Sequence, residues 1–155
     1  MGGGGVRLGH RRRAGSLDAR GQRRRSIDGE WSFAQTLRHL VFATDAWLGR
    51  AILRRPQPFH PLGQPHAEYE TDGEDMSLFA TGRPAFADVL AARAERQAQV
   101  RDFIATATPE LLAEPRPTAW SPEHEEPVRH CLHVILDEEW EHLRFALRDL
   151  DAQAT

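Results

Sequence analysis

The sequence has few of the features that would place a protein in a membrane or outside the cytoplasm. Its single cysteine, Cys131, excludes a disulfide within the chain. No apolar run approaches the length of a membrane span or of a signal-peptide core. We therefore expect a soluble, cytoplasmic protein, and 155 residues are enough for one domain with a sizeable core.

Lysine is missing as well, because all 20 basic residues are arginines, a bias typical of GC-rich genomes. The net charge of −3 is unevenly distributed. Residues 1–30 hold eight arginines against three acidic residues, a local charge of +5, so the rest of the chain carries −8. An acidic body argues against nucleic acid as a partner of the folded part, because binding to phosphates needs a basic face.

The chain divides into a tail, a domain and a short end. Residues 1–28 are rich in glycine and arginine, with four sizeable aliphatic residues at no helical spacing. Such a segment cannot offset the entropy cost of ordering, so it is expected to be disordered. The domain is expected over residues 29–150 and a C-terminal tail over 151–155.

The fold class expected from periodicity is all-α. Three stretches have apolar residues at three- and four-residue steps, and no segment alternates with period two, so no sheet is predicted. The first helix covers about residues 33–54, after a capping box formed by Ser32 and Gln35. Residues 55–83, with four prolines and three glycines, predict a long connection across the end of a bundle.

The second long helix is expected from Pro84 to about Thr106, followed by a short helical turn at 109–114. Pro127 can open the last helix, which ends near Leu150. The inward apolar residues predicted for the second helix are Phe86, Val89, Leu90, Val100, Phe103 and Ile104.

The last predicted helix carries two ionisable residues in the middle of an apolar stripe. A carboxylate on a core stripe is costly unless a cation meets it, so Glu138 needs a metal ion or a buried arginine. Residues four apart share a helix face, which lets Glu138 and His142 bind one ion together. The stripe is Val128, Cys131, Ile135, Glu138, His142, Phe145 and Asp149, and a second one beside it is Leu132, Leu136, Trp140, Leu143, Leu147 and Leu150.

A third ligand is expected from a neighbouring helix, and His39 of the first helix is the candidate. The alternative is a half-buried histidine in an ordinary hydrogen bond. Glu139 and His142 form the Glu-x-x-His pair of di-iron bundles, but no second pair exists, so a di-iron centre is not expected. Glu139 replaces Glu138 as a ligand if the helix is rotated.

Several other polar residues are less favoured candidates for the site. Arg93 and Gln97 interrupt the second helix's stripe, where Arg93 either binds a substrate anion or extends to solvent at the bundle edge. Cys131 lies about 16 Å along the helix from His142 and is expected to be a small core residue. The outer face of the last helix carries His130, His133 and Asp137, which form either a second metal site or an ordinary solvated face. The long connection carries His60 and His66, which either serve as a pocket wall or fourth ligand of the site or have no part in it.

The segments GEWSFAQTLRHLVFATDAW and LDEEWEH resemble the DinB-like four-helix bundles, the superfamily that includes mycothiol-dependent maleylpyruvate isomerase. The resemblance covers residues 29–150. It implies an up-up-down-down bundle with a long crossover, in which His39, Glu138 and His142 hold one divalent metal ion. The family's first helix would precede Gly29, where no apolar stripe exists, so that helix is missing or replaced by the tail and an apolar groove is left.

Three ligands of the His/Glu/His type leave a coordination position open, as in catalytic zinc sites, although nickel or another divalent ion would also fit. A low-molecular-weight thiol such as mycothiol would lose its proton there and could attack a small electrophile. The expected activity is therefore that of a thiol-dependent transferase or isomerase. Hydrolysis by a bound water is an alternative, and so is a non-catalytic metal-binding bundle that forms a homodimer through its groove.

Overall fold

The structure, a computed structural model, describes residues 33–66 and 68–153. Within these ranges the chain is mainly helical, which confirms the all-α class. The predicted tail and capping residue Ser32 lie outside the described residues. The elements in order are α2 (Phe33–Thr44), the π-helix η1 (Asp45–Ile52), the 3-10 helix η2 (Met76–Leu78), α3 (Phe86–Thr106), α4 (Pro109–Ala113), β1 (Pro115–Pro117), β2 (Glu125–Pro127) and α5 (Val128–Gln153).

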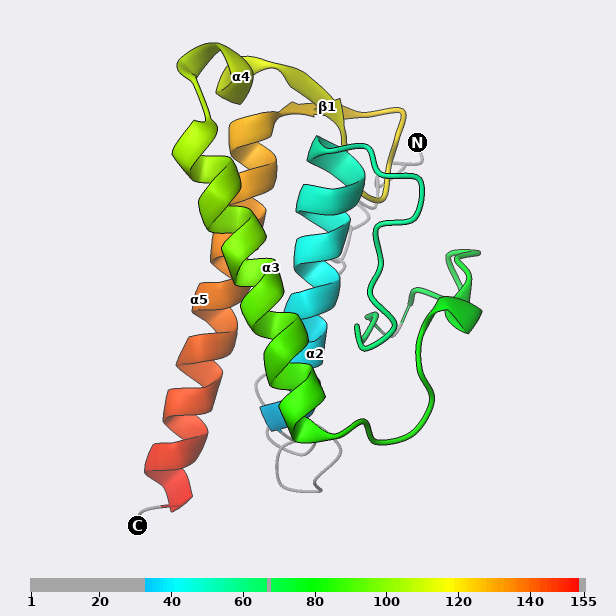
Figure 1. Ribbon diagram of the computed structural model, residues 1–155, viewed down its shortest axis with the longest axis vertical. Helices are drawn as coiled ribbons and strands as arrows, with labels where there is room; N and C mark the ends of the chain where they lie inside the picture. Colours follow the sequence, from blue (N-terminus) through cyan, green and yellow to red (C-terminus); the bar gives the residue numbers. More distant parts are fainter. Residues whose placement is uncertain (1–32, 67, 154–155) are drawn as a thin grey trace, which may run out of the picture.

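The long helices lie side by side, with α2 and α3 running in one direction and α5 in the other (Figure 1). A parallel pair of helices requires the chain to return along the bundle between them. Residues 53–85, here called the crossover segment, make this return along one side of α2 (Figure 1). None of the described helices is long and apolar enough to cross a membrane.

The first helix differs from the single α-helix expected over residues 33–54. It continues from α2 directly into the π-helix η1, where the Leu53 N–H donates to the Leu48 carbonyl oxygen five residues earlier, at 2.9 Å. Only Trp47 and Arg50 of η1 are partly exposed. A Cβ atom on Gly49 would lie 2.9 Å from Cβ of Pro58, so the crossover segment packs directly on the π-helix.

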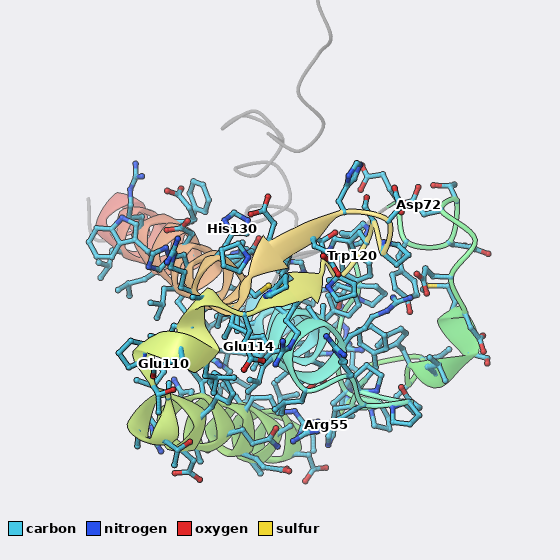
Figure 2. The ribbon with its side chains drawn as sticks, turned by 90° about the horizontal axis from the view of Figure 1, so that it is seen from above. Arg55, Asp72, Glu110, Glu114, Trp120 and His130 are labelled. Carbon is cyan, nitrogen blue, oxygen red and sulfur yellow. The ribbon has the colours of Figure 1, made fainter. Side chains whose placement is uncertain are left out.

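The expectation that the chain forms no sheet is wrong at one place. Strands β1 and β2 pair antiparallel, with Pro115 opposite Pro127. Each strand has three residues, which is too short for a period of two to be visible in the sequence. The turn between them carries Trp120 beside α2 (Figure 2), where its indole stacks on the ring of Phe42 at 5.5 Å between centroids.

The core lies between α2, η1, the first half of α5 and the aromatic residues of the crossover segment. The inward face predicted for α3 is confirmed for half of its six residues, because Val89 is buried and Val100 and Phe103 pack against the core, and it is wrong for the other three, which are exposed. Helix α3 also begins at Phe86, two residues after the expected Pro84. Helices α3 and α5 both carry exposed apolar residues, which are Phe86, Leu90 and Ile104 on α3 and Leu136, Trp140, Leu143 and Leu147 on α5.

Candidate metal centre

Three partly buried side chains meet between α2 and α5. His39, Glu138 and His142 each offer one ligand atom, and these atoms lie within 4.8 Å of one another. The Nε2 atoms of His39 and His142 are both 3.4 Å from the same Glu138 oxygen, Oε2. The structure thus brings together the three residues that the sequence singled out as metal ligands.

The distances from Glu138 Oε2 to the two imidazole nitrogens fit a divalent ion. Two ligands about 2.1 Å from a tetrahedral ion are about 3.4 Å apart, whereas an ordinary N–H···O hydrogen bond measures about 2.7–3.2 Å. Two imidazoles and a carboxylate are also among the ligands that zinc takes in proteins. The cluster therefore has a donor set that could hold one divalent ion, and its two histidine–glutamate distances match the spacing of ligands around such an ion.

The charge of Glu138 is stabilised by its neighbours. The imidazoles of His142 and His39, each 3.4 Å from Oε2, lower the pKa of the Glu138 carboxyl from its ordinary 4.5 to about 2, although burial acts in the opposite direction. The carboxylate is therefore ionised at neutral pH. An arriving cation would not have to displace a proton from it.

His39 is also held from the side opposite Glu138. Its Nδ1 atom lies 3.1 Å from the carbonyl oxygen of Gln64 in the crossover segment. A carbonyl oxygen only accepts hydrogen bonds, so Nδ1 carries the hydrogen and donates it. This bond directs Nε2 toward Glu138 and His142, as bonds behind histidine ligands do in metal sites.

Glu139, the alternative ligand, points elsewhere. Its Oε1 accepts a hydrogen bond from Nη2 of Arg93 on α3, and the two form an ion pair. Arg93 is 5% exposed, so it does not extend to solvent at the bundle edge. Gln97, the other polar residue of that stripe, is exposed.

The remaining candidates lie apart from the centre. His60 accepts a hydrogen bond from the Leu62 N–H through Nδ1, at 3.0 Å, and His66 packs its ring against Trp120, at 5.1 Å between centroids. Cys131 is fully buried in the core, as expected. His130, His133 and Asp137 are exposed on the outer face of α5, and in the described part of the chain they form no three-ligand group.

Sequence reasoning missed three buried charged residues near the site: Arg38, Asp45 and Arg96. A signal was present for Asp45, which follows Val41 by four residues and precedes Leu48 by three. Their partners come from distant parts of the chain, which periodicity cannot show.

One known family model matches most of the chain. The model described as the DinB superfamily matches residues 10–146, a range that includes all three residues of the candidate metal centre. The match begins before residue 29, where the resemblance was expected to start. No curated protein and no solved structure matches the chain.

Proposed function

The chain belongs to the DinB superfamily, which includes metal-binding proteins, and from this we propose that it binds a divalent ion and uses it to activate a low-molecular-weight thiol. The reaction class is transfer of the thiol to a small electrophile, or isomerisation through such an adduct, with a thiol of the mycothiol type. The observation that supports this most is the cluster of His39, Glu138 and His142, because three protein ligands leave the fourth position of a tetrahedral ion to an exogenous ligand. Zinc suits this donor set best.

Each residue has a defined part in this proposal. A bound ion would lower the pKa of a coordinating thiol, about 8.5 when free, so that the thiolate forms. The two Nε2 atoms and the ionised Glu138 carboxylate would hold the ion. We assign to Arg93 the orientation of an anionic substrate group, since its guanidinium has five N–H donors and the bond to Glu139 uses one.

The catalytic proposal is tested with zinc-loaded protein, a low-molecular-weight thiol and a panel of small electrophiles, with products followed by mass spectrometry. We expect thiol-dependent turnover that falls to background in Glu138→Gln and His142→Ala and is kept in His133→Ala, a control on the outer face of α5. Absence of thiol-dependent turnover across the panel contradicts the proposal. Turnover that needs no thiol would assign hydrolysis instead.

A second candidate function, self-association of a metal-binding bundle, is favoured by the exposed side of α5. Leu136, Trp140, Leu143 and Leu147 are 51%, 60%, 49% and 53% exposed and follow one another at steps of four, three and four. This is the apolar spacing of a coiled coil. The apolar side chains of such a stripe are buried only when another helix packs along it.

We propose that α5 of a second copy is this helix, in antiparallel orientation. Pairing Trp140 of one copy with Leu143 of the other brings Asp137 beside the second copy's Arg144, both exposed and of opposite charge. Sedimentation equilibrium should show a dimer that becomes a monomer in the double variant Trp140→Glu, Leu143→Glu and persists in His133→Glu. A parent that stays monomeric at high concentration contradicts the proposal and leaves this face to residues 1–32 or another partner.

A further inference from the structure

Three buried charged side chains help to anchor the crossover segment, since Arg38 and Asp45 bond to it directly and Arg96 pairs with Asp45. Arg38, Asp45 and Arg96 are 8%, 2% and 7% exposed. Charged groups are rarely buried this far unless each is paired and hydrogen-bonded. The hydrogen-bond partners of these three groups therefore indicate their structural role.

Asp45 joins two helices and the crossover segment. Its Oδ1 accepts a hydrogen bond from Nε of Arg96 on α3 at 2.7 Å, which forms a buried ion pair. Its Oδ2 accepts a hydrogen bond from the backbone N–H of His60 at 2.8 Å. The same carboxylate thus fixes α3 to η1 and anchors the beginning of residues 60–64, here called the anchored turn.

Arg38 holds the middle of the anchored turn. Its Nε donates to the Leu62 carbonyl oxygen at 2.9 Å, and its Nη2 donates to the Ala80 carbonyl oxygen at 3.3 Å. Both acceptors are backbone atoms of the crossover segment, so the guanidinium links two distant stretches of it to α2.

The anchored turn is also tightly packed. The N–H of Gly63 donates to the His60 carbonyl oxygen at 2.9 Å, which closes the turn. A Cβ atom on Gly63 would lie 3.1 Å from that oxygen and 3.3 Å from Cε1 of Phe79. A side chain at residue 63 would therefore force the turn away from α2.

Gln64, the last residue of the turn, connects this network to the metal centre. Its N–H donates to the Arg38 carbonyl oxygen at 3.0 Å, and its own carbonyl oxygen accepts from Nδ1 of His39 at 3.1 Å. The position of the Gln64 carbonyl thus depends on how the turn is anchored. A bond at Nδ1 sets both the tautomer and the ring orientation of a histidine ligand.

We propose that Arg38, Asp45 and Arg96 are positioning residues for His39. They hold the anchored turn so that the Gln64 carbonyl keeps Nε2 of His39 directed at Glu138 and His142. The inference rests on the metal binding in the proposed function and not on its thiol chemistry. Loss of groups that orient a histidine ligand typically lowers metal affinity by about 10–100-fold.

The test compares zinc dissociation constants of the purified full chain and its variants, measured by competition with a chromophoric chelator. Asp45→Asn and Arg38→Met each remove one anchor and are expected to raise the dissociation constant about 10–100-fold. Glu74→Gln is the matched control, because it breaks the 2.9 Å ion pair of Arg50 with Glu74, which ties η1 to the crossover segment outside the anchored turn. The control should bind zinc as the parent does.

A second measurement separates positioning from general loosening of the fold. In the cobalt-loaded protein, NMR reports the paramagnetically shifted Nδ1–H proton of His39 and its exchange with solvent. We expect slow exchange in the parent and in Glu74→Gln, and fast exchange in Arg38→Met, which keeps an apolar stem and remains available if Asp45→Asn does not fold.

Two results would overturn the inference, and they can be told apart. Folded Arg38→Met with parental zinc affinity and a protected Nδ1–H would show that the anchors do not position His39, while the metal site stands. A parent chain that binds no zinc would refute the proposed function and the inference together.

Discussion

Glu138 and Glu139 are neighbours on α5, yet they contact different helices. Successive residues of an α-helix point about 100° apart, so one carboxylate meets His39 of α2 while the next meets Arg93 of α3. The first belongs to the candidate metal centre and the second to an ion pair between helices. Replacing Glu138 should therefore remove the metal, whereas replacing Glu139 should lower the stability of the fold and leave the metal bound.

Glu139→Gln should lower the free energy of unfolding by about 1–2 kcal/mol and leave the metal content unchanged. It leaves the buried Arg93 without its charged partner, and the loss is below that of a fully buried pair because the Glu139 side chain is 33% exposed. Urea unfolding and elemental analysis measure the two quantities. If Glu139→Gln lost the metal and Glu138→Gln kept it, the ligand assignment would be reversed.

The lowered pKa of Glu138 predicts a pH dependence of stability in the metal-free protein. The folded-state pKa of about 2 lies below the ordinary 4.5, so the stabilisation is complete above about pH 4.5 and is lost as the pH falls toward 2. The difference in unfolding free energy between the parent and Glu138→Gln should shrink over that range in urea titrations with chelator present. A difference that stays constant would show that the carboxylate is not stabilised by the histidines.

The sequence was sufficient to single out the three residues that meet in the structure, His39, Glu138 and His142, because two ionisable residues interrupt an apolar stripe and both helix position and the family resemblance pointed to His39. It could not reveal the role of Gln64, since the group that acts there is a backbone carbonyl, which every residue has. Arg38 likewise bonds to backbone oxygens 24 and 42 residues away. Such contacts depend on the path of the crossover segment, which has no periodic pattern.

Among the elements, the π-helix η1 packs closely on the crossover segment. Gly49 faces Pro58 so closely that an added Cβ would lie 2.9 Å from the proline's Cβ. Gly49→Ala should destabilise the protein by about 1–3 kcal/mol through overpacking, as urea unfolding can measure. Alanine has the higher helix propensity, worth about 1 kcal/mol, so a stabilised variant would contradict the close contact.

The lengths of α3, α4 and α5 follow from periodicity and proline positions to within a few residues. The identity of the buried face does not, because Leu90 lies on an apolar stripe of the sequence and is 44% exposed. Periodicity identifies an apolar face but does not show which element covers it. The hairpin was missed for a different reason, since strands of three residues in a proline-rich stretch show no alternation.

At the scale of the whole molecule, the candidate metal centre lies between two antiparallel helices that are far apart in sequence. His39 comes from α2, and Glu138 and His142 come from α5, so a bound ion would cross-link them. Binding only to the folded state stabilises it by about 2.7 kcal/mol at a metal concentration 100 times the dissociation constant. Removal of metal should therefore lower the unfolding temperature.

The expected decrease is about 5–10 °C for a chain of this size. Thermal unfolding followed by circular dichroism, with and without chelator, measures it in the parent chain. The chelator should have no effect on Glu138→Gln or His142→Ala, which lack the site. An equal decrease in these variants would show that the metal stabilises the fold from somewhere else.

The metal content of the purified chain tests the central claim most directly. Elemental analysis should find one divalent ion per chain in the parent and in His133→Ala, and almost none in Glu138→Ala and His142→Ala. Metal that persists in both of these variants, or a parent that holds none after exposure to zinc, would contradict the assignment of His39, Glu138 and His142 as a metal centre.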